Sequence, residues 1–263
     1  MTRTIARDEL DRERFDAARA ALLLEGTAVV PGVLSADDAA FALERLWAAA
    51  DESERRGVPT RAEGLDPNAS NVRVWNLLDL DRVFRDLIDH PVAEALVASL
   101  LGPDFIVSNF TANIARPGSE SMSVHSDQSL VMPAPWNEPC AINIIWCLTD
   151  VRFDNGATLY APGSHRFATR DEVPSDLAAR MVAFEAPAGS IVAMDGRVWH
   201  TSGRNVTADE DRALAFAFYC RPYVRPQFNH SMALRPEVQA ELTPVQRYRL
   251  GVDLWQNVTY GRA

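Results

Sequence analysis

The sequence predicts an α+β fold that is mainly β, with a jelly-roll core and flanking N-terminal helices. Apolar residues recur at helical spacing in the first third of the chain, whereas short runs of β-forming residues follow one another from residue 104 onward. Many short strands at even spacing are typical of a sandwich or barrel. No linker is evident, so we expect a single domain, residues 1–263, with a helical part (1–103), a jelly-roll core (104–222) and a C-terminal tail (223–263).

Three helices are predicted in the first third. Residues 8–24 show apolar positions at helical spacing, and Gly26 stops the helix. Ser35 is a favourable N-cap for a second helix with an apolar stripe, and residues 91–101 form a third. Between the helices we expect a short β-branched strand at 27–30 and a polar loop at 51–72.

Six strands are predicted in the core, separated by turn signals such as Asn155-Gly156. They are expected at residues 105–114, 141–148, 157–160, 181–184, 190–194 and 212–220. In the tail, Thr243 followed by Pro244 marks the start of a last helix, with Thr as N-cap and Pro at the first helical position.

The charge of the chain limits its partners. Asp and Glu number 36 against 26 basic residues, a formal net charge of -10, so a nucleic-acid binder is not expected. All the basic residues are arginine. The absence of lysine excludes Schiff-base chemistry and a lysine-bearing phosphate loop. Any anion bound by a cationic side chain must therefore be bound by arginine.

Cysteine usage and the N-terminus indicate a cytoplasmic protein. Cys140, Cys147 and Cys220 are odd in number and lack paired spacing, as expected for buried thiols in a reducing compartment. The N-terminal segment is charged throughout, and no apolar run approaches the ~20 residues that span a bilayer. We therefore expect no membrane association.

Two histidines and one aspartate form the main candidate site. Asp127 follows His125 by two positions, so in an extended segment both side chains point to the same face. His200 comes later, just after a strand-like segment. Two imidazoles and a carboxylate form the facial triad of non-haem Fe(II) oxygenases. The alternative is a chance His-x-Asp pair and an ordinary half-buried histidine.

An arginine is expected beside these residues. Arg212 opens an alternating run in which it shares a strand face with Leu214, Phe216 and Phe218. Burying an unpaired guanidinium is costly, so a buried Arg212 needs an anionic partner, which a dicarboxylate co-substrate would supply. The alternative is a surface arginine above a packed apolar face.

His-x-Asp, the string NGATLYAPGSHR (155–166) and the distal His200 with its following Ser-Gly pair occur in this order. Together with Arg73, they resemble the phytanoyl-CoA dioxygenase (PhyH-like) family, natural-product branch. The resemblance covers roughly residues 25–225. It implies a double-stranded β-helix (cupin-like) core and an oxygenase that uses Fe(II), 2-oxoglutarate and O2. It also implies that His125, Asp127 and His200 are the iron ligands.

The resemblance assigns further roles by position. Arg212 would pair with the distal carboxylate of 2-oxoglutarate, Thr158 would hydrogen-bond the same molecule, Arg73 would reach over it and Ser202 would lie near its carboxylate. His165 falls within the motif and is expected to be a turn residue. One position departs from the family pattern, because Met122 stands where many members have Gln.

The expected reaction is oxidation, by hydroxylation, of a C–H bond in a small, largely apolar metabolite, in natural-product biosynthesis or lipid and terpenoid metabolism. The apolar residues Trp75, Phe110, Val131, Met132, Pro133 and Trp136 either cover the site or belong to the core. Desaturation, epimerisation, rearrangement or endoperoxide formation are alternative outcomes of the same chemistry. A metal-binding cupin-like protein or a zinc hydrolase is a more remote alternative, since zinc accepts the same ligands.

The C-terminal tail has three possible positions. Its apolar residues Phe228, Leu250, Leu254 and Trp255 would cap the pocket, form a dimer contact or pack on the core. Because dimers occur in the natural-product branch, a homodimer is the expected assembly.

Overall fold

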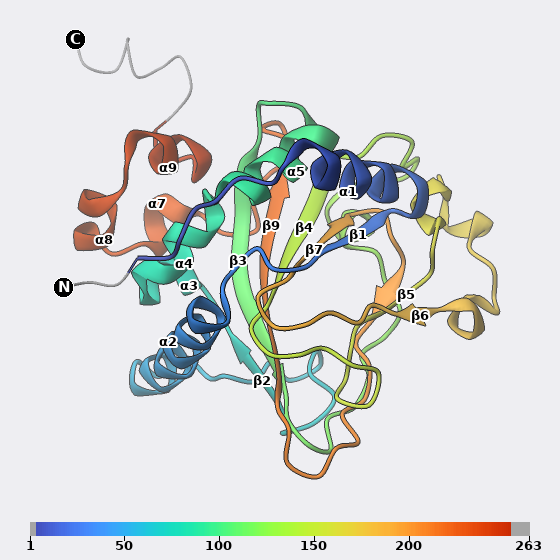
Figure 1. The fold of residues 1–263 in the computed structure, drawn as a ribbon, viewed down its shortest axis with the longest axis horizontal. Helices are drawn as coiled ribbons and strands as arrows, with labels where there is room; N and C mark the ends of the chain where they lie inside the picture. The colour runs from blue at the N-terminus through green and yellow to red at the C-terminus, as the bar shows by residue number, and fades with distance from the viewer. Residues whose placement is uncertain (1–3, 254–263) are drawn as a thin grey trace.

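An antiparallel sheet of six strands, in the order β1-β7-β4-β9-β3-β2, forms the centre of the molecule (Figure 1). The structure is a computed structural model that describes residues 4–253. The strands of this sheet are β1 (Thr27–Val30), β2 (Asn71–Val74), β3 (Ile106–Ala115), β4 (Ala141–Cys147), β7 (Ile191–Asp195) and β9 (Arg212–Cys220).

A second, smaller antiparallel sheet has the order β6-β5-β8. It consists of β5 (Leu159–Tyr160), β6 (Val182–Ala183) and β8 (His200–Thr201). On β4, Ile145 and Cys147 belong to the apolar cluster that Tyr160 and Ala183 of the small sheet contact. The space between the two sheets is therefore closed by apolar side chains at one end.

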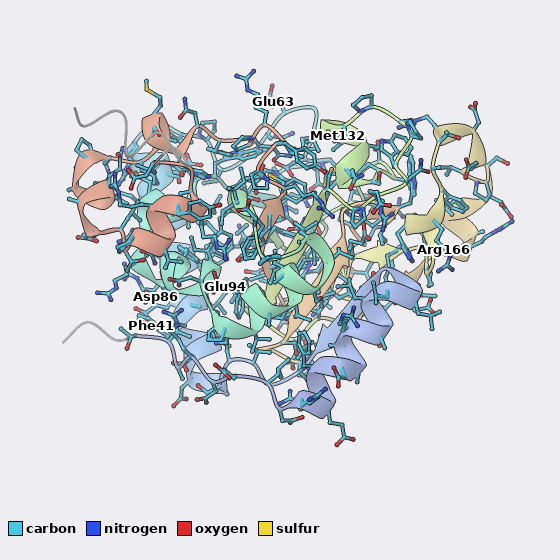
Figure 2. The ribbon with its side chains drawn as sticks, turned by 90° about the horizontal axis from the view of Figure 1, so that it is seen from above. Phe41, Glu63, Asp86, Glu94, Met132 and Arg166 are labelled. Atoms are coloured by element: carbon cyan, nitrogen blue, oxygen red, sulfur yellow. The ribbon has the colours of Figure 1, made fainter. Side chains whose placement is uncertain are left out.

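Most helices cover the other face of the large sheet. The helices are α1 (Arg12–Glu25), α2 (Ala36–Arg55), α3 (Leu77–Leu80), α4 (Arg82–Ile88), α5 (Pro91–Leu101), α6 (Asp127–Val131), α7 (His230–Ala233), α8 (Pro236–Glu241) and α9 (Pro244–Arg249), with short 3-10 turns at Ser164–Arg166, Arg170–Glu172 and Leu177–Arg180. Seen from above, Phe41 of α2, Asp86 of α4 and Glu94 of α5 lie on one side, and Glu63 and Met132 on the other (Figure 2).

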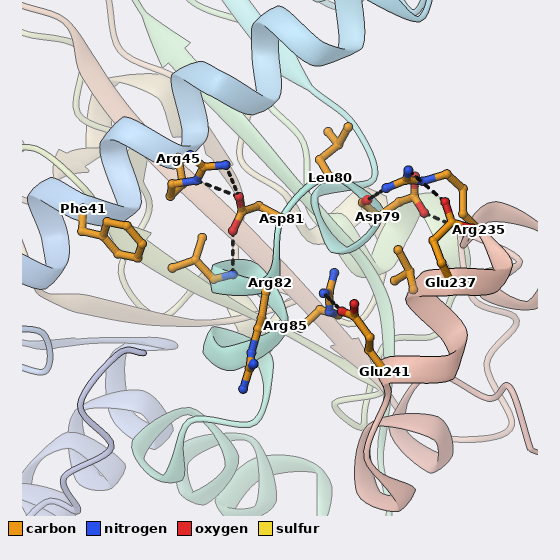
Figure 3. Close-up of a pocket in the computed structure, with 12 residues that line it drawn as sticks. Phe41, Arg45, Asp79, Leu80, Asp81, Arg82, Arg85, Arg235, Glu237 and Glu241 are labelled. Atoms are coloured by element: carbon orange, nitrogen blue, oxygen red, sulfur yellow. Dashed lines mark hydrogen bonds and ion pairs between the residues drawn. The ribbon is translucent and has the colours of Figure 1, made fainter. Parts of the chain in front are cut away.

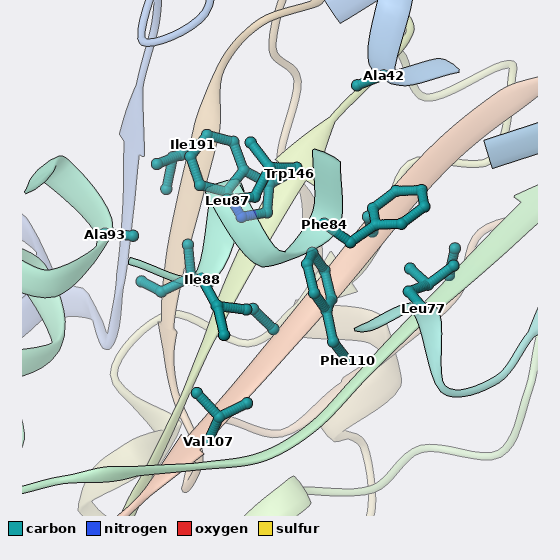
Figure 4. Packing of buried hydrophobic residues seen from close by; sticks show 14 of the residues in the cluster. Ala42, Leu77, Phe84, Leu87, Ile88, Ala93, Val107, Phe110, Trp146 and Ile191 are labelled. Carbon is teal, nitrogen blue, oxygen red and sulfur yellow. The ribbon is translucent and has the colours of Figure 1, made fainter. Parts of the chain in front are cut away.

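The main apolar core lies between this helical layer and the large sheet (Figure 4). Phe84 of α4 meets Phe110 of β3 edge to face, with ring centroids 5.8 Å apart. Trp146 of β4 is fully buried beside His90, which caps α5. Burial of such large side chains stabilises the fold by about 1.5–3 kcal/mol each. Because strand residues alternate between faces, these packing residues leave their neighbours to line the opposite side.

The predicted helix starts and stops are largely confirmed. Ser35 caps α2 by accepting a hydrogen bond from the Asp38 backbone amide, at 3.1 Å. Thr243 and Gln246 form a reciprocal capping box at the start of α9. Gly26 ends α1 with φ of 81°, a conformation that favours glycine. The first helix begins at Arg12, after the cap Asp11, rather than at residue 8.

The predicted loop at residues 51–72 is wrong at both ends. Helix α2 continues to Arg55, and Asn71–Val74 forms strand β2. This strand pairs with the free edge of β3, a contact between distant segments that local sequence does not reveal. Two short helices, α3 and α4, and the two-residue strand β8 were also not predicted.

The later helices of the described tail pack on the helical layer. Leu250 is buried in the main core, and Arg235 bonds Asp79 before α8 begins. Phe228 is half-buried and stacks on His230. Leu254 and Trp255 lie outside the described residues. No helix within residues 4–253 is long and apolar enough to span a membrane.

Candidate active site

A cavity of about 250 Å³ lies on the face of the large sheet opposite the helical layer. It collects every site residue that the sequence singled out: Arg73, His125, Asp127, Thr158, His200, Ser202 and Arg212. Phe216 and Phe218 of β9 line it as well, as the predicted alternation of that strand requires. Residues that are more than 100 positions apart in the chain thus meet in one place.

Backbone pairing brings the two histidines of the candidate triad together. His125 and His200 exchange both backbone hydrogen bonds, N–O 3.0 Å and 2.8 Å, as a directly opposed antiparallel pair. Side chains of such a pair point to the same face. Their ring centroids are therefore only 4.4 Å apart.

Asp127 reaches the same point from a helix. It is the first residue of α6, and Ser126 is the N-cap of that helix. The segment is therefore extended only up to Ser126 and not, as the His-x-Asp spacing suggested, through Asp127. Asp127 Oδ1 lies 3.7 Å from His125 Nε2 and 3.9 Å from His200 Nε2. One ligand atom from each of the three residues lies within 4.8 Å of the others, a spacing that allows one metal ion to contact all three.

Hydrogen bonds fix how these three side chains are presented. His125 Nδ1 bonds the Ser123 carbonyl at 2.8 Å, and His200 Nδ1 bonds the Val198 carbonyl at 3.0 Å. Each ring therefore carries its proton on Nδ1 and presents the Nε2 lone pair to the site. Burial lowers the pKa of His200, which favours this neutral form.

An asparagine that sequence reasoning missed holds the carboxylate. Asn143 of β4 donates from Nδ2 to Asp127 Oδ2 at 2.8 Å. The other oxygen, Oδ1, is the one that faces both histidines. The only sequence signal was the strand alternation, which places Asn143 on the face of β4 opposite the helical core.

Arg212 is a buried cation without a carboxylate partner among residues 4–253. Its side chain donates to the Gly156 carbonyl at 2.9 Å and to the Asn113 carbonyl at 3.2 Å. Gly156 has φ of 96°, so the glycine of the Asn-Gly turn suits the conformation that presents this carbonyl. Burial lowers the pKa of Arg212 to about 10, and the nearby Arg73 adds to the effect. An anionic ligand would relieve this cost.

Arg73 also lines the cavity, but its charge is matched. It forms a bidentate pair with the fully buried side chain of Asp66, with the shortest N–O distance 2.6 Å. Its guanidinium lies 5.5 Å from the Trp75 ring centroid, and its Nη2 is 3.6 Å from Met122 Sδ. Met122, the position that departs from the family pattern, thus lies beside Arg73.

Thr158 is buried in the cavity wall, and Ser202 accepts a hydrogen bond from the Met122 backbone amide at 3.0 Å. His165 lies outside the cavity lining, within a 3-10 turn, as predicted. Four further polar residues line the cavity and were not singled out from the sequence: Asn109, Thr111, Asn113 and Gln227. The first three alternate along β3 and share one face.

The apolar candidates divide between cavity and core. Trp75 lines the cavity, together with Leu65 and Leu130. Phe110 belongs to the main core, and Trp136 packs edge to face on Trp199. Val131 and Met132 contact the separate cluster that contains Phe218.

A second cleft, of about 400 Å³, lies between α2, α4 and α8 (Figure 3). Its carboxylates each pair with an arginine: Asp79 with Arg56 and Arg235, Asp81 with Arg45, Glu237 with Arg235, and Glu241 with Arg85. Two of these ion pairs, Arg235–Asp79 and Glu241–Arg85, join the tail to the helical layer. Ion pairing therefore accounts for the carboxylates of this cleft, whereas Arg212 in the first cavity has no carboxylate partner among residues 4–253.

A histidine-carboxylate triad beside a buried arginine on a two-sheet α+β scaffold defines a class of protein, the cupin-like non-haem iron oxygenases. Solved structures of two non-heme alpha ketoglutarate dependent enzymes share the fold. The chain superimposes on the carbocyclase SnoK of nogalamycin biosynthesis with a TM-score of 0.66 at 23% identity, covering 92% of this chain and 95% of that one. It superimposes on the epimerase SnoN with a TM-score of 0.63 at 22% identity, covering 82% and 87%.

The sequence comparison defines the family. Residues 23–213 match the phytanoyl-CoA dioxygenase (PhyH) family, to which the chain belongs. It is 53% identical over 230 residues to Dioxygenase af480 of Aspergillus fumigatus, covering 88% of this chain and 74% of that protein. It is 25% identical to Dioxygenase andF of Emericella variicolor, covering 72% and 68%. The family and enzyme class expected from the motifs are confirmed.

Proposed function

We propose that the protein is a non-haem Fe(II)- and 2-oxoglutarate-dependent dioxygenase (EC 1.14.11-type) that hydroxylates a C–H bond of a small, largely apolar metabolite. The observation that carries this proposal is the convergence of His125, Asp127 and His200 beside the buried, unmatched Arg212. A triad of this composition binds iron and leaves adjacent coordination sites open for a chelating co-substrate and oxygen. O2 is the second co-substrate.

The residues present fit the metal. Two imidazoles offer Nε2 and Asp127 offers Oδ1, while hydrogen bonds occupy the remaining polar atoms of each ligand except those that face the cavity. Such support from carbonyls and amides fixes the ligand orientation before any metal binds.

The residues present also fit 2-oxoglutarate. Arg212 supplies the cation for its distal carboxylate, and Thr158 supplies a hydroxyl in the same wall of the cavity. Asn113 Nδ2 is a buried donor without a hydrogen-bond partner among the described residues, and it lies beside Arg212. We assign Ser202 and Arg73 to the rim of this subsite. In this assignment, the ion pair with Asp66 holds the Arg73 side chain in place at the rim.

When bound, iron and 2-oxoglutarate supply the oxidising chemistry for the C–H bond. The contribution of the chain is to orient the groups and to exclude water. Arg212 and Thr158 hold one end of the co-substrate, and Phe216, Phe218 and Trp75 provide an apolar wall for the substrate. The epimerase SnoN was solved with Fe3+, alpha ketoglutarate and nogalamycin RO, so epimerisation, like desaturation, rearrangement or endoperoxide formation, is an alternative outcome on the same fold.

The proposal extends to the fold and the setting of the enzyme. Strands β7-β4-β9-β3 and β6-β5-β8, the latter extended by the bridge at His125, support the jelly-roll (double-stranded β-helix) description. We propose a single catalytic domain over 1–263, a cytoplasmic location consistent with the free cysteines, and a homodimer. Natural-product biosynthesis or lipid and terpenoid metabolism is the proposed context.

The test is an anaerobic titration of the iron-loaded protein with 2-oxoglutarate. We expect a visible charge-transfer band that appears only with both components and is lost in His200→Ala. The matched control is His165→Asn, which changes a histidine outside the cavity and should retain the band. Absence of the band in the wild-type protein, or its persistence in His200→Ala, would falsify the assignment in favour of a zinc hydrolase or a cupin-like metal binder.

A further inference from the structure

An irregularity in β3 determines which of its side chains reach the cavity. Val107 pairs with Tyr219 and Asn109 pairs with Phe218, so Ser108 is an extra residue, a β-bulge. Val107 packs in the main core on the helical side, yet Asn109, two residues later, lines the cavity. A regular strand would place both on the same face. The bulge therefore reverses the alternation and turns Asn109 toward the cavity.

The same bulge residue binds the C-terminal tail. The Ser108 carbonyl accepts a hydrogen bond from the Phe228 amide at 3.1 Å, and the Ser108 hydroxyl accepts one from the Gln227 amide at 2.9 Å. Gln227 is thereby held at the cavity, where its Oε1 accepts a hydrogen bond from Asn109 Nδ2. The start of the tail, at Gln227, therefore closes part of the cavity. The helices that follow pack on the helical layer.

The pair leaves two polar groups without protein partners. In this bond Asn109 uses one of its two Nδ2 protons and Gln227 uses Oε1, so the acceptor Asn109 Oδ1 and the donor Gln227 Nε2 are left over; within residues 4–253 neither of these two groups makes a hydrogen bond. Across the sheet, Asn109, Phe218 and Asn143 occupy one register row, and Asn143 is the residue that holds Asp127. The free donor and acceptor therefore lie in the row next to the triad.

Each charged side chain that lines the cavity already has an ionic partner or a place in the proposed metal and co-substrate sites. Arg73 is paired with Asp66, Asp127 belongs to the metal site, and Arg212 lies at the far end of β9 from Phe218, with the co-substrate. Apart from the two triad histidines, the other residues lining the cavity have no ionisable side chain. An anionic substrate would thus have no cation of its own at this end, and its desolvation would not be compensated.

We propose that Asn109 and Gln227 form a specificity-determining pair that binds one hydroxyl or carbonyl oxygen of a neutral, otherwise apolar substrate. A hydroxyl can donate to Asn109 Oδ1 and accept from Gln227 Nε2 at once, and a carbonyl can accept from Gln227. The apolar body of the molecule then packs on Phe218 and Trp75. This inference rests on the proposed function and narrows it, because it excludes carboxylates and coenzyme A esters as preferred substrates.

The test uses four probes with one bicyclic skeleton: decalin, 2-decalol, 2-decalone and decalin-2-carboxylate. Each is titrated anaerobically into the protein loaded with iron and 2-oxoglutarate, and binding is followed by tryptophan fluorescence, to which Trp75 in the cavity contributes, and by the visible band. We expect the wild type to prefer the alcohol and the ketone over both decalin and the carboxylate. One neutral hydrogen bond corresponds to a preference of up to about tenfold.

Variants assign the preference to the pair. In Asn109→Ala and Gln227→Ala the affinity for the alcohol should fall to that for decalin, while the affinity for decalin stays the same. Gln227 is exposed, so its variant keeps the test valid if Asn109→Ala does not fold. Asn229→Ala is the matched control, since Asn229 is an exposed tail amide whose side chain makes no capping hydrogen bond. It should bind all four probes like the wild type.

The two hypotheses fail in different ways. If the wild type forms no visible band with iron and 2-oxoglutarate, the proposed function is wrong. If the band forms but the wild type binds none of the four probes, or binds decalin or the carboxylate as well as the alcohol, the inference about the pair is wrong. Unchanged discrimination in Gln227→Ala leads to the same conclusion.

Discussion

Replacing Arg212 with methionine tests whether the buried cation exists to bind a dicarboxylate. Methionine keeps an unbranched apolar side chain in the site but removes the charge and all the donors. Arg212 is 1% exposed, and within residues 4–253 its side chain donates hydrogen bonds only to the Gly156 carbonyl and to Asn113. The substitution therefore changes one charge inside the cavity and leaves the metal ligands in place.

The expected size of the effect follows from the cost of burying the charge. A pKa lowered from 12.5 to about 10 corresponds to about 3 kcal/mol against the protonated guanidinium. Removing the charge recovers this energy, but it also removes the hydrogen bonds that Arg212 donates to the Gly156 and Asn113 carbonyls, at roughly 1–3 kcal/mol each. The two effects offset one another, so we expect the free energy of unfolding without ligand to change little. Binding of 2-oxoglutarate should instead weaken by about 2–5 kcal/mol, at least about thirtyfold.

Calorimetric titration with 2-oxoglutarate and with 2-oxopentanoate measures this directly. The second ligand lacks the distal carboxylate, so the wild type should prefer 2-oxoglutarate strongly and Arg212→Met should bind the two almost equally. Arg116→Met, which alters an exposed arginine 3.9 Å from Asp211, is the control. If Arg212→Met retains the wild-type preference for 2-oxoglutarate, the reasoning from the buried charge is refuted.

Two further predictions concern the metal site and the stability of the fold. Asn143→Ala removes the hydrogen bond to Asp127 Oδ2, so Fe(II) affinity should fall by about 10–100-fold in an anaerobic titration; unchanged affinity would show that the amide does not position the carboxylate. Burial raises the pKa of Asp89 from 3.8 to about 6. Above pH 6 the Asp89 side chain is charged in both states, and burial makes this charge unfavourable in the folded state only. Asp89→Asn should therefore raise Tm at pH 8, and the gain should disappear as the pH falls from about 6 to about 4; a gain equal at both ends would contradict this.

Local signals predicted the elements whose boundaries are set by their own residues. Ser35 and Thr243 cap helices because their side chains accept hydrogen bonds from backbone amides three residues later, and Gly26 ends a helix through its own backbone freedom. The strand Arg212–Cys220 was predicted at its observed bounds because its alternation is unbroken over the whole strand. These effects act over a few residues and can be read from the chain directly.

Other features depend on partners far away in the sequence. Strand β2 exists because it pairs with β3, and the pair between Arg73 and Asp66 forms because the turn between α2 and β2 is folded over the cavity. The bulge at Ser108 was equally hidden, since nothing in the residues around it departs from a strand pattern. As a result Asn109 and Gln227 were missed as cavity residues.

The sequence by itself determined the chemistry available to this protein: two histidines, one aspartate and an arginine in a motif order specific enough to indicate the family, in a chain without lysine. Only the tertiary structure decided how these groups are used. It joined His125 to His200 by backbone pairing, buried Arg212 without a counter-ion, and placed Asn143 and Asn109 beside the site. The reason is physical, because motif residues are defined by their chemical type, whereas desolvation, hydrogen-bond partners and strand register arise only when distant segments pack together.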